Sequence, residues 1–254
     1  LKEIVMDVSD CYYPTKPVVP FIKATQGCVV LEIQRGCIRG CRFCQAGQLY
    51  RPVRERDVEM LKDYAIKLLD NTGYEEISLS SLSSSDYSHL EELVNFLIDE
   101  CRNKKVNISL PSLRIDAFSL DVMEKVQDIK KSSLTFAPEA GTQRLRDVIN
   151  KNVTEEEIMN TCRIAFEGGY STVKLYFMMG LPTETDEDIV GMAELAQRVI
   201  DLFYSLPNRP KGKGVQVSIS TATFVPKPFT PFEFEPQATR EEIMHKQKLL
   251  VELI

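Results

Sequence analysis

The feature that most constrains the fold is a repeated order of short apolar runs and longer helical patterns. Six runs have the β-branched and aromatic residues typical of strands, and each precedes a polar turn and then helical spacing. These runs cover residues 28–33, 76–80, 106–110, 133–136, 172–177 and 215–220. Units of this kind form parallel sheets joined by right-handed crossover helices. The chain is therefore predicted to be an α/β protein, with either an open doubly wound sheet or a full or partial barrel.

A helix is predicted after each strand. Ligands are expected at one end of the sheet. The helical stretches cover 57–70, 88–102, a stretch from near 119, 142–149, 155–166, a stretch from 185, and 241–253. The helix that follows Thr185 has a capping hydroxyl and then acidic residues, which suit the positive end of a helix dipole. The loops at the carboxyl ends of parallel strands lie on one face, where α/β folds place ligands.

The loop after the first strand carries three closely spaced cysteines. Cys37, Cys41 and Cys44 are separated by three residues and then by two. Three thiolates can share one metal centre and leave a coordination position open, whereas structural zinc sites usually close with four ligands. The chain has two histidines, both far along the sequence, and its seven cysteines are an odd number for a disulfide framework. The pattern favours an iron–sulfur cluster, with zinc as the alternative.

Bulk composition narrows the class of protein. A net charge of −6 argues against a generally basic nucleic-acid-binding surface, and no apolar run has the length of a membrane span. We expect one domain over residues 1–254, with an irregular lead-in over 1–26 and a C-terminal extension with a helix over 225–254. Because position 1 is Leu, we expect a fragment of a longer protein, and the cysteines without a leader fit a reducing cytoplasm.

The three-cysteine run, with an aromatic residue before its last cysteine, resembles the signature of the radical S-adenosylmethionine (SAM) enzymes. Ser80–Ser83 resembles the segment that contacts the methionine amino group in that superfamily, in the form found in methylthiotransferase-type members. Further segments resemble that branch or an uncharacterised bacterial branch: Arg35–Gly47, Leu110–Arg114, Ala140–Arg144, Met179–Thr185 and Phe224–Pro228. The resemblance covers nearly the whole chain. It implies a partial (β/α)6 barrel of the TIM type with parallel strands, and so selects the barrel over the open sheet.

The resemblance also implies cofactors and their ligands. It implies a 4Fe-4S cluster whose fourth iron chelates SAM, and reductive cleavage of SAM to a deoxyadenosyl radical that abstracts hydrogen from a substrate. The implied metal ligands are Cys37, Cys41 and Cys44, and the implied SAM contacts are Phe43, Ser81, Ser83, Ser112, Glu139 and Arg144.

Each implied SAM contact has a plainer alternative. Phe43 would flank the adenine or cap the cluster, or it would anchor the loop in the core. Arg144 suits the cofactor carboxylate, or it is an ordinary arginine on a helix surface. Glu139 suits the ribose hydroxyls, or it simply lies at the N-terminal end of the following helix. The serines could serve only turns. Six arginines over residues 35–56 would favour a reduced cluster, form surface ion pairs or contact an RNA backbone.

The leading prediction is an enzyme, an oxidoreductase or transferase, whose substrate stays open, with RNA or protein both possible. A reductant such as flavodoxin or ferredoxin and further domains of the full-length chain are the expected partners, and no membrane is expected. A second cluster, as in methylthiotransferases, or a cobalamin would have to come from outside this chain. The alternative is a non-catalytic iron–sulfur module for electron transfer or scaffolding.

Overall fold

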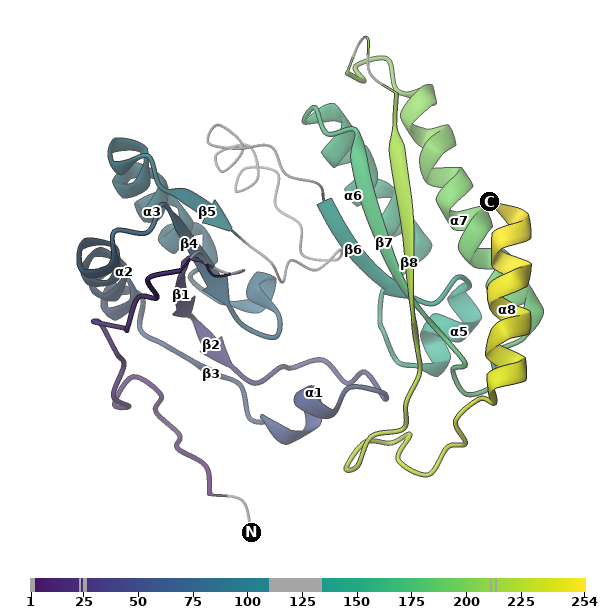
Figure 1. Ribbon diagram of the computed structural model, residues 1–254, viewed down its shortest axis with the longest axis horizontal. Helices are drawn as coiled ribbons and strands as arrows, with labels where there is room; N and C mark the ends of the chain where they lie inside the picture. The colour runs from purple at the N-terminus through teal and green to yellow at the C-terminus, as the bar shows by residue number, and fades with distance from the viewer. Residues whose placement is uncertain (1–2, 23, 25–26, 110–133, 211, 213) are drawn as a thin grey trace. The chain divides into compact units, whose positions relative to one another are not determined.

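Parallel strands and their covering helices occur in two units of the computed structural model (Figure 1). The structure describes residues 3–22, 24, 27–109, 134–210, 212 and 214–254. Unit 1 comprises Leu1–Ile38 and Tyr50–Lys131, and unit 2 comprises Arg39–Leu49 and Ser132–Ile254. The predicted single domain with its lead-in and extension stays a prediction.

Unit 1 is built on a three-stranded parallel sheet in the order β1-β4-β5. Its elements are β1 (Val29–Glu32), β4 (Glu76–Ser80), β5 (Asn107–Ser109), α2 (Val58–Thr72) and α3 (Leu90–Lys104). Alternate strand residues such as Leu31, Ile77 and Leu79 are fully buried in one core with α2 and α3. The intervening residues are largely polar and half-buried, so the opposite face of this sheet is polar.

Short elements complete unit 1. The strands β2 (Gln34–Arg35) and β3 (Arg54–Glu55) form an antiparallel pair, and Ser84–Asp86 forms a 3-10 turn. The lead-in, where described, has no helix or strand, and Tyr13 ties it to β1. The Tyr13 hydroxyl donates to the Val30 carbonyl at 2.8 Å and accepts from the Glu32 N–H at 3.1 Å. The lead-in therefore satisfies backbone groups at the outer edge of β1.

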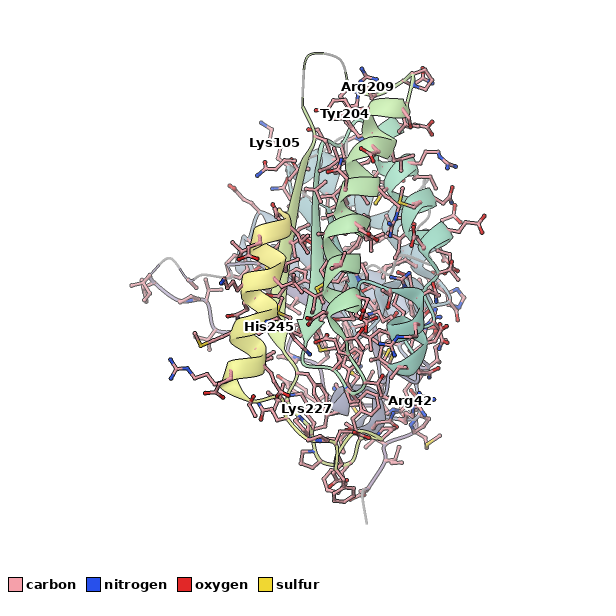
Figure 2. All side chains as sticks on the ribbon, turned by 90° about the vertical axis from the view of Figure 1, so that its right-hand side faces the viewer. Arg42, Lys105, Tyr204, Arg209, Lys227 and His245 are labelled. Atoms are coloured by element: carbon pink, nitrogen blue, oxygen red, sulfur yellow. The ribbon has the colours of Figure 1, made fainter. Side chains whose placement is uncertain are left out.

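Unit 2 is built on a second parallel sheet in the order β6-β7-β8. Its strands are β6 (Leu134–Glu139), β7 (Thr172–Met179) and β8 (Gln216–Thr223), and its helices are α1 (Gln45–Leu49), α5 (Gln143–Val148), α6 (Glu155–Glu167), α7 (Asp186–Ser205) and α8 (Arg240–Leu253). α7 packs against β7 and β8 and contacts α6 and α8. Figures 1 and 2 both show α8 alongside α7.

The helix ends follow local rules that were visible in the sequence. Asp57 caps α2 by accepting from the Met60 N–H at 3.0 Å, and Gly73 ends that helix in the left-handed region. The Asp188 carboxylate accepts from the Thr185 N–H at 2.9 Å, so Thr185 begins α7 as predicted. Every predicted strand is present within the described residues, and the predicted helix near 119 lies outside them.

Among the described helices, none combines the length and apolar character needed to cross a membrane.

Candidate metal centre and ligand pocket

The cysteine loop follows β1 and β2 and runs from unit 1 into unit 2. Cys37 belongs to unit 1, whereas Cys41 and Cys44 belong to unit 2; Cys41 is buried and the other two are half-buried. All seven cysteines lie in described residues and carry thiols. Within the described residues, no three His, Cys, Asp or Glu side chains are placed so that they could hold a metal ion together. The assignment of Cys37, Cys41 and Cys44 as ligands stays a prediction, which rests on the chemistry of three thiols.

Unit 2 holds its part of the loop through the end of α5 and the residues that follow it. The Arg42 N–H donates to the Ile149 carbonyl at 2.9 Å, and its guanidinium donates to the Val148 carbonyl at 2.5 Å. The Asn150 side-chain amide donates to the Gly40 carbonyl at 2.8 Å. These contacts fix the backbone on both sides of Cys41.

Backbone N–H groups shape the turn that presents Cys44. The Cys44 N–H donates to the Cys41 carbonyl at 3.1 Å, and the Gly47 N–H donates to the Cys44 Sγ at 3.3 Å. These two hydrogen bonds hold the backbone and the sulfur of Cys44, a predicted ligand, in one turn.

Phe43 packs into unit 2. Its ring contacts a buried apolar cluster, whose members are Ala140, Leu145, Ile149, Leu181, Phe224 and Phe232. This packing is the anchoring alternative of the two that were predicted for Phe43. A contact with adenine stays a prediction.

Gly36 is required by crowding within unit 1. Its φ is +92°, and a Cβ there would lie 2.5 Å from the Tyr50 carbonyl oxygen and 2.7 Å from the Pro52 carbonyl oxygen. The backbone of residues 50–53 occupies the space that a side chain at this position would fill.

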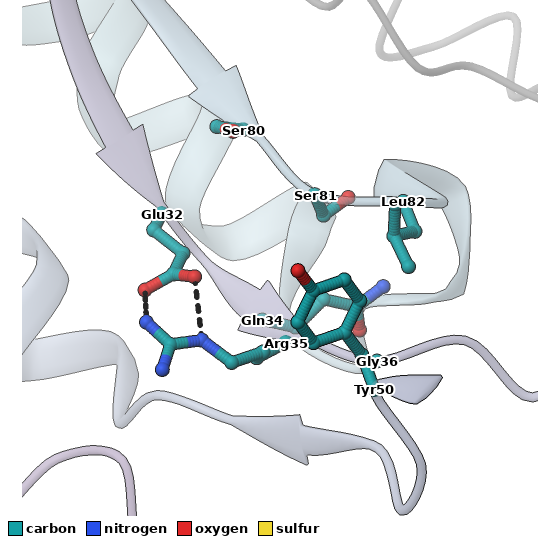
Figure 3. A pocket seen from close by; sticks show the side chains of 8 residues that line it. All are labelled: Glu32, Gln34, Arg35, Gly36, Tyr50, Ser80, Ser81 and Leu82. Carbon is teal, nitrogen blue, oxygen red and sulfur yellow. Dashed lines mark hydrogen bonds and ion pairs between the residues drawn. The ribbon is translucent and has the colours of Figure 1, made fainter. Parts of the chain in front are cut away.

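A pocket of about 370 Å³ opens at the carboxyl ends of β1 and β4 in unit 1 (Figure 3). It is lined by Glu32, Gln34, Arg35, Gly36, Tyr50, Ser80, Ser81 and Leu82. Ser81 was predicted to contact SAM, and it lies in this lining. Its hydroxyl is 3.0 Å from that of Ser84 and accepts from the Ser83 N–H at 3.2 Å. The pocket occupies the position where parallel sheets bind ligands.

Two buried polar atoms beside this pocket have no hydrogen-bond partner within the described residues. Gln34 donates its amide N–H to the Ser83 carbonyl at 2.5 Å, but its Oε1 is unpaired. The Ser83 hydroxyl is also unpaired, and both side chains are almost fully buried. An unpaired buried acceptor costs about 1–3 kcal/mol, so such atoms call for a partner. Gln34 lines the pocket, and its amide oxygen suits an ammonium or hydroxyl donor.

Glu32 and Arg35 are the charged residues in the lining of the pocket. Arg35 binds Glu32 with two hydrogen bonds of 2.9 and 2.8 Å (Figure 3), and Arg56 donates to Glu32 at 3.1 Å. Burial alone would raise the pKa of Glu32, but the hydrogen bonds from Arg35 and Arg56 outweigh it and lower that pKa. Glu32 is therefore ionised and already neutralised by its neighbours.

The arginines of residues 35–56 are largely structural where their contacts are described. Arg54 and Arg56 are buried and donate to backbone carbonyls of the lead-in, those of Val5 and Val8. Arg56 also lies 5.0 Å from the ring centroid of Tyr13. Together with Arg35 and Arg42, these residues form ion pairs and carbonyl contacts rather than a free cationic surface.

Glu139 ends β6 at a place where the pairing with β7 shifts register. Its φ is +69°, which is unusual for a residue other than glycine, and its carboxylate pairs with Lys151 at 3.2 Å. A contact with the ribose stays a prediction. Ser112, another predicted contact, lies outside the described residues.

Arg144 has protein partners of its own. Its guanidinium donates to the Thr183 hydroxyl at 3.2 Å, to the Thr183 carbonyl at 2.9 Å, and to the buried Asp188 carboxylate. Burial alone would raise the pKa of Asp188, but hydrogen bonds from Thr142, the Thr185 N–H and Arg144 outweigh it and lower that pKa. A cofactor carboxylate would compete with Asp188 for Arg144.

Sequence reasoning missed several residues that shape these sites. Gln34 and Asn150 act on segments far away in the chain, and Asp188 was seen only as a helix-start acid. Asp188 lies three residues after Thr185 in the sequence, and this spacing predicts that Asp188 caps the start of α7. It does not predict the ion pair between Asp188 and Arg144.

The family model described as the radical SAM superfamily matches residues 31–196. An uncharacterised protein of Methanocaldococcus jannaschii is 37% identical over 251 residues, which are 98% of this chain and 52% of that protein. A putative methylthiotransferase of the same organism is 25% identical over 192 residues, which are 70% of this chain and 42% of that protein. The chain thus spans about half of these curated relatives, or less.

A solved structure supports the predicted class of fold. The radical SAM methyltransferase TsrM from Kitasatospora setae, solved with cobalamin and a 4Fe-4S cluster, has a TM-score of 0.62 at 13% identity. The match covers 82% of this chain and 36% of that one. The predicted fold class, a partial barrel of parallel β/α units, is confirmed by this likeness and by the parallel sheets of both units.

Proposed function

This chain belongs to the radical SAM superfamily, and we propose that it carries the cofactor-binding core of a radical SAM enzyme. Cys37, Cys41 and Cys44 would hold a 4Fe-4S cluster, and SAM would bind beside it. When bound, these groups supply the chemistry: one-electron reduction cleaves SAM to methionine and a deoxyadenosyl radical, which takes a hydrogen atom from a substrate.

The observation that carries this proposal is the three-cysteine loop after β1, inside the segment that the family model matches. The Gly47 N–H at the Cys44 sulfur and the contacts of Arg42 and Asn150 around Cys41 support it, because they fix the backbone of two predicted ligands. The other four cysteines do not share this setting. Burial raises the pKa of Cys101 to about 11 and that of Cys162 to about 12, so both stay protonated and are poor ligands.

The pocket of unit 1 supports a place for the amino-acid end of SAM. An ammonium group would find the Ser81 hydroxyl in its lining, and Gln34, another lining residue, carries a buried Oε1 that is unpaired within the described residues. We include two further residues in the proposed site. Ser83 accepts a hydrogen bond from Gln34, and Phe43 anchors the cysteine loop in unit 2. Contacts of SAM with Ser112, Glu139 and Arg144 remain part of the proposal; Arg144 would have to exchange Asp188 for the cofactor carboxylate.

The partners follow from the chemistry. Reduction of the cluster needs an electron donor such as flavodoxin or ferredoxin, and a reducing compartment such as the cytoplasm suits seven thiols. The substrate, RNA or protein among the possibilities, and any second cluster or cobalamin would depend on the rest of a longer protein. A non-catalytic iron–sulfur module is the second candidate.

The two candidates differ in whether SAM is cleaved. The reconstituted protein, reduced with dithionite under anaerobic conditions in the presence of SAM, should form deoxyadenosine and methionine in equal amounts, measured by liquid chromatography with mass spectrometry. Ser81→Ala and Gln34→Leu should lower the yield, whereas Ser88→Ala, an exposed serine of the same unit, should not. A reduced, cluster-loaded protein that binds SAM and forms neither product would overturn the enzyme in favour of the electron-transfer module.

A further inference from the structure

The sheet of unit 2 has one face that its strand pattern leaves partly open. Along β7, Val173, Leu175 and Phe177 are fully buried, whereas Lys174 and Tyr176 point to the opposite face, where Lys174 is half-buried and Tyr176 is 37% exposed. α7 contacts the sheet, and the buried residues of β7 form the core on that side. Lys174 and Tyr176 therefore lie on the face opposite this core, and both are partly exposed within the described residues.

Hydroxyl groups flank both residues on the neighbouring strands. The parallel register places Thr135 and Ser218 directly beside Lys174, and Ser220 directly beside Tyr176. The Lys174 ammonium lies 4.7 Å from the centre of the Tyr176 ring. No carboxylate stands in these two rows of residues.

Lys174 differs from the other half-buried lysines that the structure describes in unit 2. Lys151 pairs with Glu139, and Lys246 pairs with Glu184. Within the described residues, Lys174 contacts the Tyr176 ring and forms no ion pair. A cation held over a ring keeps its full charge and three donors for a further partner.

We propose that Lys174 and Tyr176, with the hydroxyls of Thr135, Ser218 and Ser220, form a subsite for an anionic group, a carboxylate or a phosphate. The ammonium supplies the charge and the hydroxyls supply donors, as in other anion sites. Binding of the anion itself does not depend on the radical reaction.

Lysine footprinting tests the subsite with inorganic phosphate and acetate as probes. The anaerobically prepared, cluster-loaded protein is acetylated with an N-hydroxysuccinimide ester in chloride, phosphate or acetate at equal ionic strength, and Lys174 modification is followed by mass spectrometry. At an anion concentration of about four times Kd, acetylation of Lys174 should slow about fivefold. Lys227, an exposed lysine of the same unit, should react equally in all three salts. Ser218→Ala, which removes one of the hydroxyl donors beside Lys174, should weaken the protection.

The possible results of this footprinting experiment test the subsite and identify the class of anion that it binds. Protection by phosphate alone or by acetate alone supports the subsite and identifies the anion class, and protection by both supports an anion site of either class. Equal rates at Lys174 in all three salts, or equal slowing at Lys227, would overturn it. Since the readout needs no SAM cleavage, failure here with normal deoxyadenosine formation removes only the subsite, while protection without deoxyadenosine removes only the radical reaction.

Discussion

At the scale of single residues, Gly141 packs directly against the backbone of α7 in unit 2. A Cβ on Gly141 would lie 2.3 Å from the Met192 backbone N and 2.4 Å from the Asp188 carbonyl oxygen. These are backbone atoms, which cannot turn aside. The close packing therefore places the start of α5 and its residue Arg144 against α7.

Gly141→Ala should lower the free energy of unfolding by about 3 kcal/mol, because the helix backbone must move to admit a methyl group. Urea denaturation followed by circular dichroism measures this loss. Gly214→Ala is the matched control, since its nearest neighbour, the Tyr204 hydroxyl, is 3.8 Å away and the change should stay within about 0.5 kcal/mol. Equal stability of the two variants would show that the contact is not as tight as described.

The role of a residue could be predicted only where residues close to it in the sequence form a recognisable pattern. The spacing of Cys37, Cys41 and Cys44 is a local signal, and so was the serine run that places Ser81 at the pocket. The hydrogen bond from Asn150 to Gly40 joins residues 110 positions apart, and no local rule indicates it. Arg144 shows the same limit, because a family pattern gave it a ligand while the fold gives it Asp188.

At the scale of elements, α8 is held to the turn after β7 by one buried charge pair. The Lys246 ammonium donates to Glu184 at 2.6 Å, and the Gly180 N–H donates to the same carboxylate oxygen at 2.7 Å. Glu184 is fully buried and its second oxygen is unpaired within the described residues. Burial raises the pKa of Glu184, although Lys246 and the Gly180 N–H oppose the rise. Figure 2 shows the neighbouring His245 on this helix.

Lys246→Met should destabilise the protein by about 2–3 kcal/mol near neutral pH, because it leaves a buried carboxylate without its cation. A carboxyl with a raised folded pKa stabilises the fold most below its unfolded pKa of about 4.3, and this stability is lost as pH rises through the folded pKa. Because the substitution raises that pKa further, the deficit should be larger at about pH 8 than at about pH 5.

Denaturant unfolding of Lys246→Met and wild type at both pH values measures this difference. Lys248→Met serves as control, since Lys248 and its partner Glu252 are both mostly exposed and 3.8 Å apart, a pair worth less than about 0.5 kcal/mol. A deficit for Lys246→Met that is the same at both pH values, or smaller at the higher one, would contradict the assigned role of Glu184.

Elements were predictable in proportion to their length. The six strands and the long helices follow from periodicity and caps, with ends shifted by a few residues. The missed elements β2, β3 and α1 are two to five residues long. Such short segments carry too little pattern to be recognised, and contacts distant in sequence such as Gln34 with Ser83 hold them in place.

At the scale of the whole molecule, the sequence predicted the alternation of strands and helices and the fold class. The division into two units was not predicted, because periodicity does not report which strands share a sheet. Each unit places a polar sheet face opposite its helix-covered face. Glu32 and Glu76 lie on that of unit 1, and Lys174 lies on that of unit 2.

The metal content of a cysteine series tests the central claim most directly. After anaerobic reconstitution, the wild type should hold about four irons and about four acid-labile sulfides per chain, and Cys37→Ala, Cys41→Ala and Cys44→Ala should each hold fewer than about one of either. Cys101→Ala and Cys162→Ala, which alter buried thiols in helices, should match the wild type. Zinc without sulfide in the wild type, or equal iron retention across all five variants, would contradict the account.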